Sequence, residues 1–210
     1  MLNNHSRSTL FSFFKTFHLP QLSITAKIKS PKDLLLLLEK KQIDLSHFLI
    51  FQVAKTSLDI PEFRLREKNS KLVEVDSITC SYLIQSPLTK INFCYIPYQD
   101  NLKTFLLNAK DKQDKALVAK HIQTKDDISD NLIDITIANK LDITAIFNPI
   151  SDVKDISTPA FTIGKVGKTK DCTSFSLTIR AHHGLADALH YSQFVDKLKS
   201  NIDQWVSKNK

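Results

Sequence analysis

Two adjacent histidines, His182 and His183, stand between an alternating strand pattern and an amphipathic helix pattern. A neutral imidazole is well suited to take a proton from a hydroxyl group near pH 7. Neighbouring strand residues face opposite sides of a sheet, so we expect one ring in the core while the other is free to face a cleft. Junctions between a strand and a helix often carry functional side chains. The pair alone leaves both a catalytic and a purely structural histidine open.

Other kinds of site find little support in the sequence. Adjacent histidines rarely share one ion and no further ligand cluster is visible, so we expect no metal site. The three cysteines form no C-x-x-C pair and are interpreted as reduced thiols, at Cys80, Cys94 and Cys172. Three glycines in 210 residues exclude the glycine-rich phosphate-binding loops.

The charge is positive but not concentrated. The net charge is +7, and of the 29 basic residues only Arg7, Arg64, Arg66 and Arg180 are arginines. Scattered lysines favour a solvated surface over a nucleic-acid interface, and a nucleic-acid-binding module would rest on charge alone. A positive surface also suits a small polyanion such as coenzyme A.

Residues 1–32 contain no acidic residue and resemble an organellar transit peptide. Against that reading, residues 21–29 alternate like a half-buried strand that a sheet would need. The longest apolar run, Leu34–Leu38, is far too short to span a membrane. We therefore expect a cytoplasmic protein with neither a membrane nor a nucleic-acid partner.

Periodicity predicts an α+β fold in one domain over residues 1–210, with a large and mostly antiparallel sheet. A hydrophobic content of 42% fits one globular domain of this length. Helices are predicted over residues 31–41, 47–58, 100–124 and 187–206. Strands are predicted over residues 21–29, 63–65, 72–78, 82–84, 91–96, 132–137, 141–147, 161–166 and 173–181.

The stretch His182–Ala188 resembles the His-His-x-x-x-Asp-Gly signature of the chloramphenicol acetyltransferase family. Further matches follow in the family's order, at Arg7 with Phe11, Leu19-Pro20 before Ile24–Ile28, Pro61–Arg64, Leu72-Val73 to Asp76-Ser77, and Pro159–Lys165. The resemblance covers nearly the whole chain. Dihydrolipoyl acyltransferases share a similar histidine motif and fold, but the N-terminal matches favour the chloramphenicol branch.

This resemblance implies a CoA-dependent acyltransferase fold, a two-layer sandwich of a mixed, mostly antiparallel sheet with helices on one side. It also implies a homotrimer with active sites between subunits. The implied reaction is direct transfer of acetyl from acetyl-CoA to a hydroxyl of a small molecule, without a covalent enzyme intermediate. His183 would be the general base, and His182 would be structural.

In the resembling family the signature aspartate pairs with an arginine rather than with the base. Asp187 and Arg7 are the matching residues here. Removing one partner of a partly buried ion pair leaves the other charge unpaired, which lowers the stability of the fold by on the order of 3–5 kcal/mol. Two alternatives stay open, since Arg7 could be a frayed terminal residue and Asp187 could simply cap the last helix.

The sequence departs from the family where a serine stabilises the oxyanion. One alignment places Ile146 at this position and another places Ala145, and neither side chain can donate a hydrogen bond. Thr144 is the nearby substitute, expected on the same strand face as Ile146. Thr162 matches a threonine that holds a water molecule near the oxyanion. Loss of one oxyanion donor costs ~10²–10³ in turnover, so we expect weakened activity.

The remaining matches concern the two substrates. Lys165 matches a coenzyme-binding lysine, but Val166 replaces an aromatic residue that would stack on adenine. Phe13 and Phe14 match the aromatic pair of the acceptor pocket, although they could equally be ordinary core residues. Ala188 replaces the signature glycine. The acceptor could therefore be chloramphenicol, which would imply antibiotic resistance, or another alcohol.

Our leading hypothesis is an acetyl-CoA-dependent O-acetyltransferase that uses His183 as the base. The missing serine motivates an alternative, a catalytically degenerate trimer that keeps the fold and serves as a binding or structural protein.

Overall fold

The computed structural model describes residues 6–123, 131–147, 149 and 156–210. In the first half these form α1 (Ser8–Phe14), β1 (Gln21–Pro31), α2 (Leu34–Lys40), α3 (Leu45–Asp59), the 3-10 helix η1 (Pro61–Arg64), β2 (Leu65–Lys68), β3 (Lys71–Glu74), β4 (Thr79–Ser86) and β5 (Lys90–Pro97). The second half contains α4 (Leu102–Val118), β6 (Leu132–Ile137), β7 (Ala160–Ile163), β8 (Gly167–Lys168), β9 (Cys172–His182) and α5 (Ala188–Asn209).

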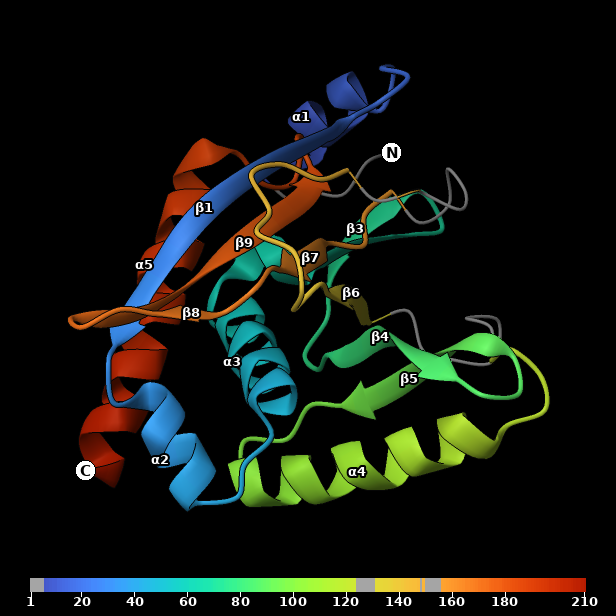
Figure 1. Ribbon diagram of the computed structural model, residues 1–210. Coiled ribbons are helices and arrows are strands. Elements are labelled where there is room, and N and C mark those ends of the chain that lie inside the picture. The colour runs from blue at the N-terminus through green and yellow to red at the C-terminus, as the bar shows by residue number, and fades with distance from the viewer. Residues whose placement is uncertain (1–5, 124–130, 148, 150–155) are drawn as a thin grey trace.

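A seven-stranded sheet runs through the molecule in the order β1-β9-β7-β6-β4-β5, with β8 paired to β9 (Figure 1). Two strand pairs are parallel, β4 with β6 and β6 with β7, and the others are antiparallel. Helices α3, α4 and α5 pack on the sheet through one apolar core. The α+β class and the mixed, mostly antiparallel sheet predicted from the sequence are confirmed.

The two faces of β9 differ because successive side chains point to opposite sides. Phe175, Leu177 and Ile179 point toward the helices and are buried in the main core. On the opposite face Thr178 lies between Thr25 of β1 and Thr162 of β7 in the sheet register. The hydroxyls of Thr25 and Thr178 are 2.7 Å apart, so this polar face is bonded within itself.

The predicted strand over residues 141–147 is wrong. This segment has no regular structure, and Leu141 and Phe147 are 61% and 49% exposed. Its alternating apolar residues find no place in the sheet, because β7 is already paired with β6 on one side and β9 on the other. Isolated hydrogen bonds hold the segment instead, such as the one from the Lys165 amide to the Leu141 carbonyl at 2.8 Å.

Several smaller predictions also differ from the structure. Phe63 and Arg64, in the predicted strand over residues 63–65, belong to the 3-10 helix η1, and the helix predicted over residues 100–124 ends at Val118. The helix expected from Pro31 begins only at Leu34, because β1 pairs with β9 as far as Pro31. The strand expected over residues 72–78 ends at Glu74 and pairs with β2 in a separate two-stranded sheet.

The β2–β3 hairpin supports the end of the main sheet where β9 terminates. Arg66 is 2% exposed and donates to the carbonyls of Phe63, Leu65 and Leu132 at 2.7–3.0 Å, which ties the hairpin to β6. A second small core then joins the hairpin to α1 and to the turn after β9, through Phe11, Leu65, Leu72 and Leu185.

The three cysteines, all in the described part of the chain, are free thiols as predicted. No helix among the described residues has the length and apolar character that crossing a membrane requires.

Candidate active site

His183 follows the last residue of β9 and begins the turn that leads to α5. Its amide donates to the Pro20 carbonyl at 2.8 Å, and its ring packs on Phe14 with centroids 4.3 Å apart. The side chain is half-buried, and its Nδ1 atom is buried without a hydrogen-bond partner among the described residues. The ring is thus fixed by packing, with Nδ1 shielded from solvent and the side chain as a whole partly exposed.

His182 is fully buried on the other side of the strand end, as expected for one member of the pair. Its Nδ1 accepts from the Gly184 amide at 3.0 Å, which assigns its proton to Nε2, and its ring packs on Phe11 at 4.4 Å. Burial lowers the pKa of His182 to about 4, and the charges of Lys15 and His183 act in the same direction. The ring is therefore neutral near pH 7.

Gly184 lets the helix α1 lie directly on this turn. A Cβ atom at residue 184 would be 2.5 Å from the Phe11 Cα and 2.6 Å from the Leu10 carbonyl oxygen. These are backbone atoms, so α1 could not stay in place beside any other residue. This requirement was not predicted from the sequence, although one of only three glycines stands in the turn.

Arg7 lies beside Asp187, although 180 positions separate them in the sequence. The guanidinium donates to Asp187 Oδ2 at 2.8 Å, and the side chains are 11% and 36% exposed. Asp187 Oδ1 also caps α5 by accepting from the Leu189 amide at 3.1 Å. The two roles considered from sequence, ion pair and helix cap, are therefore combined in one carboxylate.

The pKa of Asp187 shows the strength of this environment. Partial burial favours the neutral acid, but hydrogen bonds from Arg7 and His190 outweigh it and lower the pKa to about 2. Neither His190 nor Glu62, which faces the same cluster, was singled out from sequence. His190 stands three residues after Asp187, a spacing typical of a helix capping box, and this was the available signal.

Thr162 lies away from His183 along the sheet, whereas Thr144 and Lys165 are exposed outside it. Thr162 is buried on β7 in register with Thr178, five residues before His183 along β9, or roughly 16 Å at the rise of a strand. Thr144 is exposed in the irregular segment 141–147, and Lys165 is exposed after the end of β7. Nearby, the Ile146 carbonyl accepts from the Ser23 hydroxyl at 3.4 Å. The sheet register therefore separates Thr162 from the histidine within one chain.

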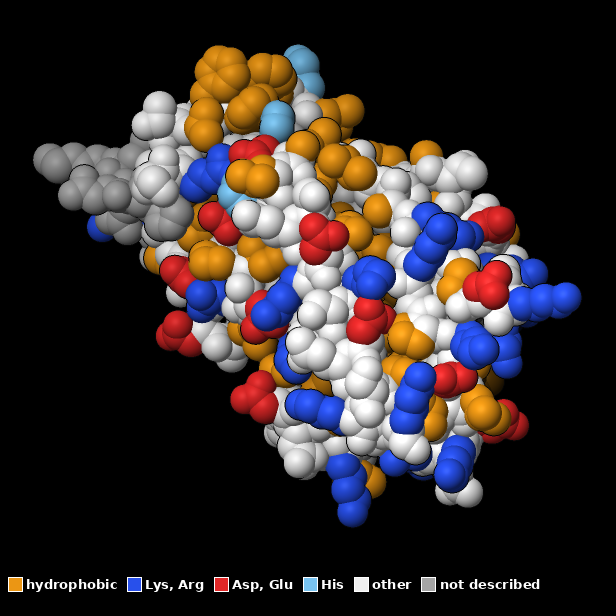
Figure 2. All heavy atoms as spheres, turned by 90° about the vertical axis from the view of Figure 1, so that its left-hand side faces the viewer, with side chains coloured by type: hydrophobic (Ala, Val, Ile, Leu, Met, Phe, Trp, Pro, Cys, Tyr) orange, Lys and Arg blue, Asp and Glu red, His pale blue; other side chains and the backbone are white. Residues whose placement is uncertain are grey.

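The surface around His183 is apolar. Phe14 is half-buried against the histidine, while Phe13 is 57% exposed. The exposed hydrophobic residues of this end, here called the α1 patch, are Leu10, Phe13, Phe17 and Leu19. Figure 2 shows hydrophobic side chains gathered with histidines at this end of the molecule.

Among the described residues, no three His, Cys, Asp or Glu side chains form a group that could hold a metal ion.

The family model described as chloramphenicol acetyltransferase matches residues 1–199. A chloramphenicol acetyltransferase from Bacillus pumilus is 23% identical over 208 residues, covering 97% of this chain and 94% of the relative. One from Escherichia coli is 24% identical over 187 residues, covering 88% and 81%.

Solved structures show the same fold. A chloramphenicol acetyltransferase structure superposes with a TM-score of 0.83 at 22% identity, covering 95% of this chain and 96% of that chain. The cubic core of a pyruvate dehydrogenase multienzyme complex superposes with a TM-score of 0.72 at 13% identity, covering 95% and 88%. The fold is therefore that of the CoA-dependent acyltransferases.

The buried neutral ring of His182 predicts a loss of stability in mild acid. As pH falls below 6.5 the unfolded chain protonates this histidine, while the folded ring stays neutral until its pKa of about 4. The free energy of unfolding should fall by about 2–3 kcal/mol across that window. Asp187 acts separately, at lower pH, because its stabilising charge is lost only between its ordinary pKa of 3.8 and about 2.

Urea unfolding of the wild type and of His182→Asn between about pH 7 and pH 4.5 measures the slope of the free energy of unfolding against pH. Asparagine still offers an acceptor to the Gly184 amide but does not titrate, so its slope should be shallower. Equal slopes for the two proteins would show that His182 is not the group responsible.

Proposed function

The chain belongs to the chloramphenicol acetyltransferase family, whose members are acyltransferases, and we propose that it transfers acetyl from acetyl-CoA directly to a hydroxyl of a small molecule with His183 as the general base. The observation that carries this proposal is the half-buried imidazole of His183. It is packed on Phe14 and stays partly exposed at the end of β9.

In the proposed reaction the imidazole of His183 takes the proton of the acceptor hydroxyl as its oxygen attacks the thioester carbonyl carbon. The tetrahedral intermediate collapses, the carbon–sulfur bond breaks, and the imidazolium returns the proton to the coenzyme A sulfur. The acetyl group forms an ester with the acceptor. A base placed in this way contributes ~10²–10⁴ to the rate.

Oxyanion stabilisation is the weak part of the proposed site. Thr144 is exposed in an irregular segment, and neither Ala145 nor Ile146 carries a donor. Thr162 is buried at the centre of the polar face and is our candidate to hold a water molecule near the oxyanion. We propose that turnover by this chain is lower than it would be with a serine donor at the position of Ala145 or Ile146.

The two substrates would approach from different sides. Phe13 and Phe14 offer an apolar surface beside His183 for the acceptor, chloramphenicol or another alcohol. Exposed Lys165 is the candidate contact for coenzyme A phosphates. Acetylation of chloramphenicol would confer antibiotic resistance. The free thiols fit a reducing compartment, and we place the protein in the cytoplasm.

The proposal includes a homotrimer in which two chains build each site. His183 and Thr162 lie roughly 16 Å apart along the sheet of one chain, too far to act on one acetyl group. The α1 patch exposes four large hydrophobic residues around His183. A second copy that covers this patch would bury it and could bring its own Thr162 toward the histidine.

Sedimentation equilibrium at micromolar concentration should give about three times the chain mass of 23.9 kDa. Phe17→Asp in the α1 patch should shift the protein toward monomer. Leu107→Asp, on the exposed face of α4, is the matched control and should leave the mass unchanged. A monomeric wild type would contradict the trimer.

The activity test is thiol release from acetyl-CoA with chloramphenicol and a panel of small alcohols. His183→Ala should lower the release by ~10²–10⁴. His121→Ala removes an exposed histidine that follows α4 and lies outside the α1 patch, and it should have no effect.

Unchanged release by His183→Ala would exclude this residue as the base. If no alcohol gives release above the His183→Ala background, the alternative applies. The missing oxyanion donor favours that alternative, in which the chain is a catalytically degenerate trimer that binds a ligand or partner.

A further inference from the structure

We propose that Glu62 and His190 are positioning residues, which act through Asp187 and Arg7 to hold α1 against the ring of His183. This inference rests on the proposed function, since it assumes that His183 is the base. It adds two residues from separate elements to the machinery of the site. Glu62 belongs to η1, and His190 lies in the first turn of α5.

The imidazole of His190 lies between two carboxylates. Its Nδ1 is 2.7 Å from Asp187 Oδ1, and its Nε2 is 3.3 Å from Glu62 Oε1. A guanidinium nitrogen of Arg7 is 2.9 Å from the same Nδ1. The Asp187 amide also donates to this Nδ1, at 3.3 Å, so a ring with its proton on Nε2 accepts at Nδ1 and donates toward Glu62, whereas a ring with protons on both nitrogens donates to both carboxylates. His190 therefore bridges Glu62 to the Arg7–Asp187 pair.

The cluster is shielded enough for its charges to interact strongly. The His190 side chain is 13% exposed, Arg7 is 11% exposed, and Glu62 is 25% exposed. Without the imidazole, two carboxylates would face one guanidinium with nothing between them. Removing either His190 or the Glu62 charge should therefore disturb the geometry of the Arg7–Asp187 pair.

The disturbance reaches His183 through a short chain of contacts. Arg7 directly precedes α1, and α1 ends at Phe14, whose ring packs on His183. The same helix packs on the turn at Gly184, where backbone atoms leave no space. A shift at Arg7 is thus passed to the aromatic ring that orients the proposed base.

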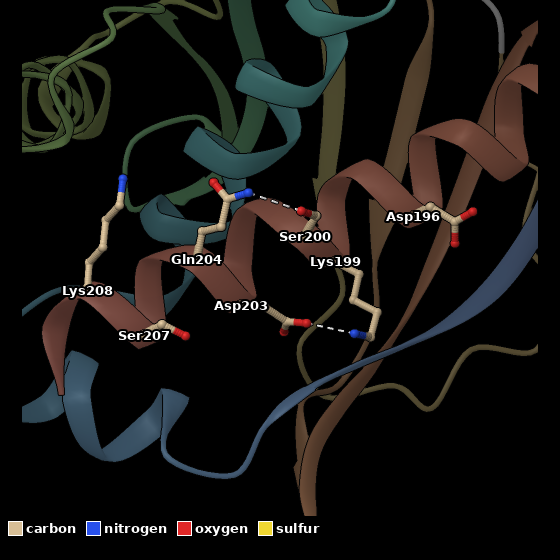
Figure 3. Close-up of a pocket in the computed structure, with 7 residues that line it drawn as sticks. All are labelled: Asp196, Lys199, Ser200, Asp203, Gln204, Ser207 and Lys208. Carbon is tan, nitrogen blue, oxygen red and sulfur yellow. Dashed lines mark hydrogen bonds and ion pairs between the residues drawn. The ribbon is translucent and has the colours of Figure 1, made fainter.

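Other charged side chains on α5 lack such a connection. A hollow along the outer side of this helix is lined by residues of α5 alone (Figure 3). There Lys199 pairs with Asp203 at 2.6 Å, and Gln204 donates to Ser200 at 3.2 Å, so the bonds stay within the helix. Asp203→Asn removes an ion pair from the same helix without touching α1, and it serves as the control.

The test compares Glu62→Gln, His190→Gln and Asp203→Asn. The first two should lower kcat about tenfold or more while KM for acetyl-CoA changes less than about twofold, because the base is misplaced and the coenzyme site is intact. Combining either with Asp187→Asn should add little further loss, since all three changes break one chain of contacts. Asp203→Asn should match the wild type.

A structural role alone would lower the melting temperature of Glu62→Gln and His190→Gln and leave kcat unchanged, and that result would overturn the proposal. Fully additive losses with Asp187→Asn would overturn it as well.

An activity-independent readout separates this inference from the proposed function. The ring resonances of His183, in protein labelled at histidine, report its contact with Phe14. They should shift in Glu62→Gln and His190→Gln but not in Asp203→Asn, even if no acceptor is found. Unchanged resonances in all three variants would contradict the positioning role.

Discussion

The backbone of α1 lies directly against the turn after β9, and the position of His183 depends on this contact. Gly184 permits it, because the backbone of Leu10 and Phe11 occupies the space of a Cβ atom. The Arg7–Asp187 pair fixes the start of the helix, and the ring of Phe14 at its end packs on His183. The proposed base, at the C-terminal end of a strand, thus takes its orientation from the opposite end of the chain.

The two faces of the main sheet differ in chemical character. Its apolar face is covered by α3, α4 and α5, whereas its other face carries hydroxyl groups such as those of Thr25, Thr162 and Thr178. The register sets Thr162 and His183 far apart within one chain. A trimer, as we propose, would reconcile this separation with a single reaction centre and would cover the α1 patch.

Strong local patterns were readable from the sequence. The alternation of β1 and β9 and the apolar stripe of α5 each correspond to an observed element. Residues 141–147 have the same alternation but no strand, because neighbouring strands already fill the pairing positions. The alternation shows which side chains are apolar, but it does not show which strands have an edge available for pairing.

Long-range contacts explain what the sequence could not show about the site. The resemblance to a family directed attention to Arg7 and Asp187. Glu62 and His190 join them only because η1, α5 and α1 converge in space. Gly184 is similar, since its role depends on a helix that lies at the other end of the sequence.

The most direct measurement is the turnover of Gly184→Ala beside Gly167→Ala. A Cβ at residue 184 must displace α1, whereas one at residue 167 meets only the Ser174 carbonyl oxygen, at 3.9 Å. A misplacement of about 1 Å costs on the order of a hundredfold in rate, so Gly184→Ala should lose acetyl transfer to that extent. Gly167→Ala should retain it. Wild-type turnover in Gly184→Ala would contradict the claim that α1 holds the catalytic histidine.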